Sequence, residues 1–155
     1  NLTKWFYEIT KSREFISLHG NIPIDSMNGF RAPILAKADN MFKVLKHTGF
    51  KYDSSINERY NSDGLFNWPY TFDRYDEDKI FNVGQGPQES YPGLWEIPLY
   101  YLYKNDSKSH FTLMDLYNGD YQTILDTFMH NFLERKNSNK VPLILNLNAL
   151  WLNDP

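Results

Sequence analysis

The chain has 155 residues and a formal net charge of −3, and this length suits one domain and no more. No apolar run approaches the ~18 residues that would span a membrane, and the scattered basic residues disfavour nucleic-acid binding, which needs clustered Lys and Arg. The absence of cysteine excludes disulfides, thiolate zinc sites and Cys nucleophiles within the sequence.

The chain opens with an amphipathic pattern. Apolar residues within 2–13 recur at i, i+3, i+4 and i+7, which predicts a helix with one buried face. Gly20 and Pro23 end this region. The residues that define the face are Leu2, Trp5, Phe6 and Ile9.

Residues 24–35 predict a short strand followed by a loop, and residues 40–48 predict a second helix. Asp39 has the residue type and the place of an N-cap, and Gly49 suits the position just after a helix. A short alternating strand, residues 50–52, follows directly.

The middle of the chain has no sustained period. Residues 57–93 are rich in Asn, Asp, Gly, Pro and aromatics, and a stretch this long predicts a functional loop or an irregular excursion. Residues 94–103 predict a strand that lies at an edge or is kinked, because Pro98 lies inside it.

The last part predicts a helix and a strand. Asp120 caps the clearest helical pattern of the sequence, and the polar turn 135–140 closes it. Residues 141–145 form a continuous apolar run, which is typical of a buried parallel strand. The helical pattern places seven apolar residues on one face: Tyr121, Ile124, Leu125, Phe128, Met129, Phe132 and Leu133.

The alternation of helices and strands predicts an α/β fold, either a partial barrel or a small open sheet, in a single domain over residues 1–155. The phosphate-binding glycine loop, the dinucleotide fingerprint and the nucleophile elbow are absent. The four histidines do not pair at i+3 or i+4, so no helical metal motif exists. The 11 Tyr, 11 Phe and 4 Trp suit stacking on sugar rings, but an aromatic core accounts for them as well.

Five segments carry a family resemblance when they are taken together and in order. They are Gly29–Pro33, with an Arg-x-Pro motif, Gly49–Ile56, with Tyr-Asp-Ser-Ser, and then Trp68–Asp73, Ser90–Pro98 and Asn131–Leu152. The set resembles the polysaccharide deacetylase family, also called the NodB-homology or carbohydrate esterase 4 family, and chitin deacetylases in particular. The resemblance covers nearly the whole chain and corresponds to the C-terminal half of the family's domain.

The resemblance implies a partial, distorted (β/α) barrel with its site at the carboxyl ends of the strands. It also implies the removal of N-acetyl groups from N-acetylglucosamine polymers such as chitin, and an extracellular location. In the family, an Asp and two His hold a divalent metal, often zinc. A second Asp is the general base and a late His is the general acid, while the metal and a backbone N–H stabilise the oxyanion.

The family's motifs assign roles to three residues of this sequence. Arg31 matches the arginine that orients the base carboxylate, a task that suits a bidentate guanidinium; a surface ion pair is the alternative. The backbone N–H of Ile34 matches the oxyanion donor. Asp53 matches the carboxylate that orients the acid histidine, although an Asp before Ser54 and Ser55 also suits a turn.

Three aromatic residues are candidates for a sugar-binding groove: Trp68, Tyr70 and Trp95. Trp95 suits core packing equally well, because it lies in an apolar strand.

Two departures from the family pattern bear on activity. The Asp pair and the His pair of the family's first two motifs have no counterpart here, so no metal site is expected within this chain. Asn148 stands where the acid histidine belongs, and an amide cannot deliver a proton near neutral pH. The loss of a positioned acid typically costs about 10²–10⁴ in rate.

Three interpretations stay open. The chain belongs to a longer deacetylase, whose N-terminal barrel half is then its partner; or it is a non-catalytic homologue that binds chitin; or it is a degraded paralogue kept for a protein contact or without function. Each leaves residues 1–155 inactive on their own. Half a barrel would leave strand edges and an apolar face open, so self-association is expected.

Overall fold

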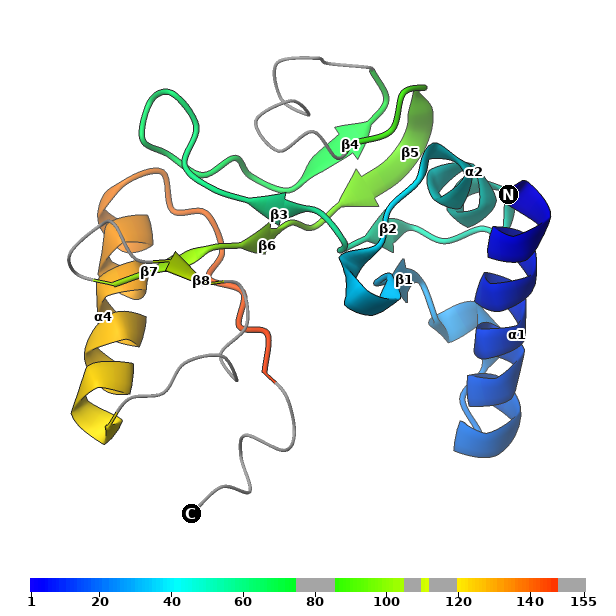
Figure 1. The fold of residues 1–155 in the computed structure, drawn as a ribbon, viewed down its shortest axis with the longest axis horizontal. Helices are drawn as coiled ribbons and strands as arrows, with labels where there is room; N and C mark the ends of the chain where they lie inside the picture. The colour runs from blue at the N-terminus through cyan, green and yellow to red at the C-terminus, as the bar shows by residue number, and fades with distance from the viewer. Residues whose placement is uncertain (75–85, 105–109, 112–119, 148–155) are drawn as a thin grey trace. The chain divides into compact units, whose positions relative to one another are not determined.

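The structure is a computed structural model that describes residues 1–74, 86–104, 110–111 and 120–147 (Figure 1). The chain divides into two compact units. The first unit comprises residues 1–56 and 69–98, and the second unit comprises residues 57–68 and 99–155. Each unit is described by itself.

The first unit is built on a four-stranded sheet with the strand order β1-β2-β5-β4. Three neighbouring strands are parallel, and β4 runs antiparallel to β5. All three parallel strands therefore end at the same edge of the sheet. The strands are β1 (Gly29–Phe30), β2 (Tyr52–Asp53), β4 (Tyr70–Phe72) and β5 (Tyr91–Glu96).

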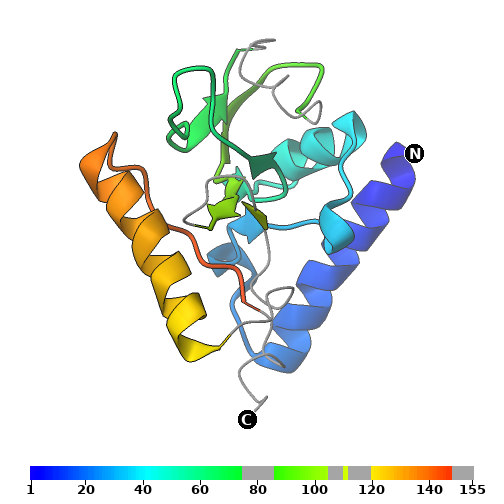
Figure 2. The ribbon, with the colours of Figure 1, turned by 60° about the vertical axis from the view of Figure 1, so that its left-hand side comes forward.

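Two α-helices belong to the first unit, α1 (Leu2–Gly20) and α2 (Asp39–His47). They contact each other, and α2 also packs against β5 (Figures 1 and 2). Phe42 of α2 meets Phe72 of β4 edge-on, with ring centroids 5.1 Å apart. The core thus lies between α2 and the sheet, with Ile9, Met41, Phe42, Leu45, Phe50 and Leu94 among its buried members.

The helices of the first unit occur where they were predicted, with two differences in detail. α1 does not end near residue 13 but continues to Gly20, because residues 2–19 contain no Gly or Pro, and the left-handed backbone of Asn21 (φ 51°) ends the helix. Asp39 is the first residue of α2 and not its N-cap, since its carboxylate accepts a hydrogen bond from the Gln88 N–H at 2.9 Å. Gly49 follows α2 with φ +79°, as expected.

The predicted strand and loop at residues 24–35 contain the short strand β1 between two 3₁₀ turns, η1 (Ile24–Ser26) and η2 (Pro33–Leu35). The apolar face of α1 is only partly covered. Ile9 is buried, but Phe6 is 44% exposed.

The second unit contains two pairs of strands and α4 (Tyr121–Asn137). β3 (Asn57–Glu58) is parallel to β6 (Leu99–Tyr100), and β7 (Leu102–Tyr103) is antiparallel to β8 (His110–Phe111). α4 packs on β7. Asp120 caps α4 as predicted, because its carboxylate accepts a hydrogen bond from the Thr123 N–H at 2.8 Å.

The fully buried residues of α4 are polar, so the predicted apolar face was correct only in part: Ile124 and Phe128 are partly buried and pack against Leu102. Thr127, Asn131 and Arg135 are its buried residues. The Asn131 amide donates to the Tyr103 carbonyl at 2.6 Å and accepts from the Tyr103 N–H at 3.0 Å, so it satisfies the backbone of β7. Five of the predicted core residues are 37–78% exposed: Tyr121, Leu125, Met129, Phe132 and Leu133.

The strand predictions were less accurate than the helix predictions. Residues 57–93 were predicted to be irregular, but β3, β4 and the start of β5 lie within them. Residues 94–103 form three short strands, and Pro98 marks the first break. Residues 141–145 are not a strand, since Pro142 has no N–H to donate to a ladder.

The described chain is a mixed α/β structure, as predicted. Closure into a partial barrel and folding as a single domain stay predictions. No helix in the described ranges has the length and apolar character needed to cross a membrane.

Candidate functional site

Polar side chains gather where the parallel strands of the first unit end. Arg31 directly follows β1, Asp53 ends β2 and Glu96 ends β5. Asp53 and Glu96 are register partners on neighbouring strands. Ligands of open α/β sheets and barrels bind at the carboxyl ends of the strands, so this edge is the candidate functional site.

Arg31 is exposed, and Ser54 holds its guanidinium in place. Nε donates to the Ser54 carbonyl at 3.0 Å and Nη2 donates to the Ser54 hydroxyl at 2.9 Å. Two bonds to one residue fix the plane of the guanidinium. Arg31 is thus anchored to the residue that follows Asp53.

Asp53 is fully buried, and the turn after β2 closes over its carboxylate. Oδ1 accepts from the Ser55 hydroxyl at 2.7 Å, and Oδ2 accepts from the Ser55 N–H at 3.1 Å. Burial raises the pKa of Asp53, and its hydrogen bonds with Ser55 and Glu96 act in the opposite direction. The turn role considered for Asp53 is therefore present, and a sealed carboxylate of this kind can orient a neighbour but cannot touch a polymer.

Glu96 and Lys37 complete this site, and neither was predicted. Glu96 is fully buried and accepts a hydrogen bond from the Ile56 N–H at 3.1 Å. Lys37 Nζ donates to the Ser55 carbonyl at 3.0 Å. Burial lowers the pKa of Lys37, while the charges of Glu96 and Asp53 act to raise it. A carboxylate within an apolar strand was the available signal for Glu96; no sequence signal marks Lys37.

Ile34 lies in η2, the turn after Arg31. Its side chain is 97% exposed, and its backbone is left-handed (φ 50°, ψ 21°), which is rare for a β-branched residue. Within the part of the chain that the structure describes, the Ile34 N–H makes no hydrogen bond. This N–H is the group that the resemblance assigns to the oxyanion.

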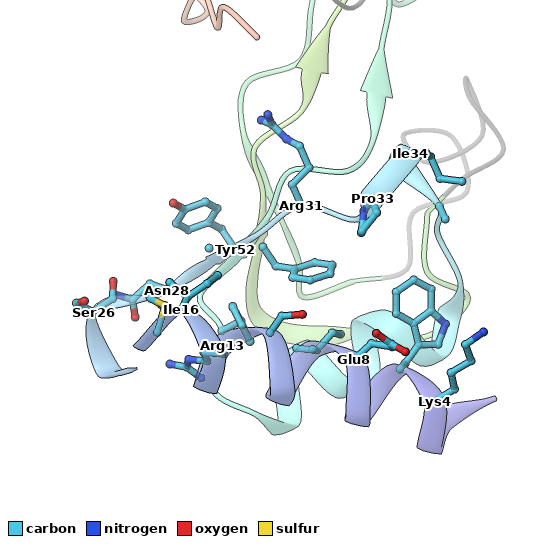
Figure 3. A pocket seen from close by; sticks show the side chains of 18 of the residues that line it. Lys4, Glu8, Arg13, Ile16, Ser26, Asn28, Arg31, Pro33, Ile34 and Tyr52 are labelled. Atoms are coloured by element: carbon cyan, nitrogen blue, oxygen red, sulfur yellow. The ribbon is translucent and has the colours of Figure 1, made fainter. Parts of the chain in front are cut away.

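A groove of about 1010 Å³ lies between α1 and β1 (Figure 3). Trp5, Phe30 and Phe50 supply apolar walls, and the groove extends to Arg31 and Ile34. It therefore connects the candidate site to the face of α1.

Aromatic side chains lie on the opposite face of the sheet from the core. Tyr52 and Trp95 are register partners, 37% and 47% exposed. The Tyr52 ring covers Gly29 so closely that a Cβ at Gly29 would lie 2.1 Å from it. The exposure of Trp95 favours a surface role over core packing. Tyr70 is half-buried and packs edge-on against a core phenylalanine.

The remaining predicted residues lie elsewhere. Trp68 belongs to the second unit; it is 53% exposed, and its indole N–H donates to the Asn139 carbonyl at 3.1 Å. Asn148 lies outside the described residues.

The resemblance implies a divalent metal held by one Asp and two His. Among the described residues, no three His, Asp or Glu side chains come together to hold an ion. The residues described thus do not fit the metal, and no step is derived through it.

The fold and the site define an α/β protein with a polar site at the carboxyl edge of a parallel sheet. No protein-family profile matches the chain. The chain is 27% identical to chitin deacetylase 1 of Bombyx mori over 164 residues, a region that covers 97% of this chain. It spans about 30% of the length of that relative. The chain is thus distantly similar to part of a chitin deacetylase.

Proposed function

We propose that this chain is the C-terminal part of a polysaccharide deacetylase of the chitin-deacetylase type. It would supply the side of the site that orients the catalytic groups and contacts the polymer. Two observations support the proposal: the similarity to a chitin deacetylase along 97% of the chain, and the location of Arg31 and Asp53 at the carboxyl ends of two paired strands. In this proposal the sheet of the first unit is one side of a partial, distorted (β/α) barrel.

The roles proposed for this chain are those of positioning groups. Arg31, fixed by Ser54, would orient the carboxylate of a general base. Asp53, sealed at the end of β2, would orient a general acid. The free N–H of Ile34 would donate to the oxyanion of the tetrahedral intermediate.

Residues 1–155 should not deacetylate chitin by themselves. The reaction of the family needs an activated water and a proton donor, and Asn148 cannot donate a proton near neutral pH. The purified chain, incubated with N-acetylglucosamine oligomers and zinc, is expected to release no acetate above the buffer background. A chitin deacetylase serves as the positive control. Robust acetate release would contradict the assignment of positioning roles.

A non-catalytic, chitin-binding function is the second candidate, and the exposed pair Tyr52 and Trp95 favours it. Aromatic rings stack on the apolar faces of sugars. An indole that is half exposed on the open face of a sheet can supply such a stacking surface without any catalytic group.

Binding can be measured by titrating N-acetylglucosamine oligomers into the chain and recording the calorimetric signal. Trp95→Ala is expected to weaken binding by about tenfold, which corresponds to the loss of one stacking contact. Tyr7→Ala is the matched control, because Tyr7 is an equally accessible aromatic residue of the first unit, 60% exposed on α1. Equal effects of the two substitutions, or no binding by the unmodified chain, would contradict sugar stacking on Trp95.

An extracellular location follows from the same proposal, since chitin is an extracellular polymer. The lack of cysteine is compatible with it but gives no support.

A further inference from the structure

The second unit holds a sealed carboxyl group that the proposed function does not use. Glu58, in β3, is 4% exposed. Its Oε1 accepts a hydrogen bond from the Asn67 side-chain amide, and within the described ranges its buried Oε2 has no hydrogen-bond partner. Burial of this kind favours the neutral acid over the ionised carboxylate.

Burial raises the pKa of Glu58 to about 7, against the opposing effect of the Asn67 hydrogen bond. Charged and titratable residues on or beside the described strands and α4 of this unit include Arg59, Tyr60, Tyr100, Tyr101, Tyr103, His110, Glu134 and Arg135. Arginine and tyrosine ordinarily titrate well above pH 7, and glutamate well below it. His110, whose ring meets that of Tyr101 edge-on at 4.7 Å, is the histidine of this set, so the test includes a variant that removes its imidazole.

Asn67 links Glu58 to the segment that carries Trp68. The Asn67 carbonyl accepts from the Tyr100 hydroxyl at 2.8 Å, and the Asn67 side-chain oxygen accepts from Asn61 at 3.4 Å. The next residue is Trp68, whose indole N–H is held by the Asn139 carbonyl. The Asn67 side chain thus ties segment 61–68 to Glu58 of β3, and the Tyr100 hydroxyl and the Asn139 amide hold the same segment at the Asn67 and Phe66 carbonyls.

We propose that Glu58 is a positioning residue whose protonation sets the conformation of segment 61–68 and so the orientation of the exposed Trp68 indole. The neutral acid remains enclosed beside Asn67. The ionised carboxylate, which has no cationic partner bonded to it among the described residues, draws water into the strand, and the segment moves away from β3. Sugar stacking on Trp68 then weakens as the pH rises through neutrality, a consequence that rests on the proposed carbohydrate function.

The test follows the fluorine NMR signal of Trp68 in protein labelled with 5-fluorotryptophan, assigned by Trp68→Phe. In the unmodified chain the signal is expected to titrate with a midpoint near the pKa of Glu58, and the Trp95 signal, from the other unit, is not. Glu58→Gln, a neutral isostere, should abolish the Trp68 titration, and His110→Gln should leave it intact. A Trp68 signal that still titrates in Glu58→Gln, or that does not titrate in the unmodified chain, would overturn the proposal.

Two further measurements keep the result decisive. If Glu58→Gln does not fold, Asn67→Ala is used instead. This substitution removes the hydrogen bond between Asn67 and Glu58 and should also abolish the Trp68 titration. An unchanged titration would refute the mechanism. Affinity for N-acetylglucosamine oligomers is then compared at about pH 5.5 and about pH 8.5, with an expected loss of about tenfold at the higher pH. If no binding occurs at either pH while Trp68 still titrates through Glu58, the carbohydrate function fails and the role of Glu58 stands.

Discussion

Ile34 combines nearly full exposure with a left-handed backbone. The side chain gains little from burial, so nothing in its own packing offsets the conformational cost, which is about 1–2 kcal/mol for an L-residue. Such a residue persists when the surrounding chain fixes it, and here Pro33 and the Ala32–Leu35 turn, closed at 3.0 Å, do so. Strain of this kind clusters at functional sites.

Replacing Ile34 by glycine is therefore expected to stabilise the chain by about 0.5–1 kcal/mol, because relief of the strain exceeds the extra entropy that glycine brings to the unfolded state. Urea unfolding monitored by circular dichroism measures the change in free energy. The matched control is Ile16→Gly, since Ile16 is exposed within α1 and should lose about 1 kcal/mol. Destabilisation by Ile34→Gly comparable to the control would show that the strain is absent.

At the residue scale, the sequence predicted only those candidate site residues that lie in short motifs. Arg31 and Asp53 could be identified because short motifs carry them. Glu96 and Lys37 could not, since their contact with Asp53 and Ser55 depends on strand register and on the turn after η2. Contacts between residues 18 positions apart (Lys37 and Ser55) or 43 apart (Asp53 and Glu96) leave no periodic trace in one sequence.

The helix α4 shows the same limit at the scale of an element. Its start and its cap could be predicted, because capping is a local property, but the predicted closing turn 135–140 begins too early, since α4 continues to Asn137. Its buried face could not be predicted, since hydrogen bonding to the backbone of β7 decides which residues of α4 are buried. The backbone of Tyr103 needs a donor and an acceptor, and Asn131 supplies both, while five residues of the predicted apolar face are exposed.

Substitution of Asn131 by alanine is expected to destabilise the second unit by about 2–3 kcal/mol, because a buried backbone donor and acceptor lose their partner. Leu133→Ala, on the exposed stripe of the same helix, is the control and should change the free energy of unfolding by less than about 1 kcal/mol. Urea unfolding of both variants measures the difference. Similar losses would mean that the apolar stripe, not Asn131, holds α4 in place.

At the scale of the whole molecule, the sequence predicted the α/β class but not the division of the chain. The two units interleave, since residues 57–68 of the second unit lie between two parts of the first. Neither a change in composition nor a linker marks the points where the chain passes from one unit to the other. A pattern sought in windows of a dozen residues cannot detect them. The five motifs nevertheless occur in the family's order across both units. The similarity to a chitin deacetylase along 97% of the chain agrees with this order.

Residues 1–155 are expected to self-associate in solution. β1 lies at an edge of the first-unit sheet, and in the described part of the chain no strand pairs with its outer side. α1 adds apolar surface nearby, with Phe15 64% and Leu18 78% exposed. Open strand edges and apolar patches are the features that drive chains together, so sedimentation velocity at increasing protein concentration should show species larger than the monomer.

The variant Phe15→Lys with Leu18→Lys removes apolar surface from α1 and adds charge, and it should shift the distribution toward the monomer. Ser12→Lys, an exposed polar position of the same helix, is the control that adds charge alone and should shift it less. If the unmodified chain is a monomer at every concentration, the open strand edge and the apolar surface of α1 do not cause self-association. An equal shift in both variants would instead assign the association to charge and not to the apolar face of α1.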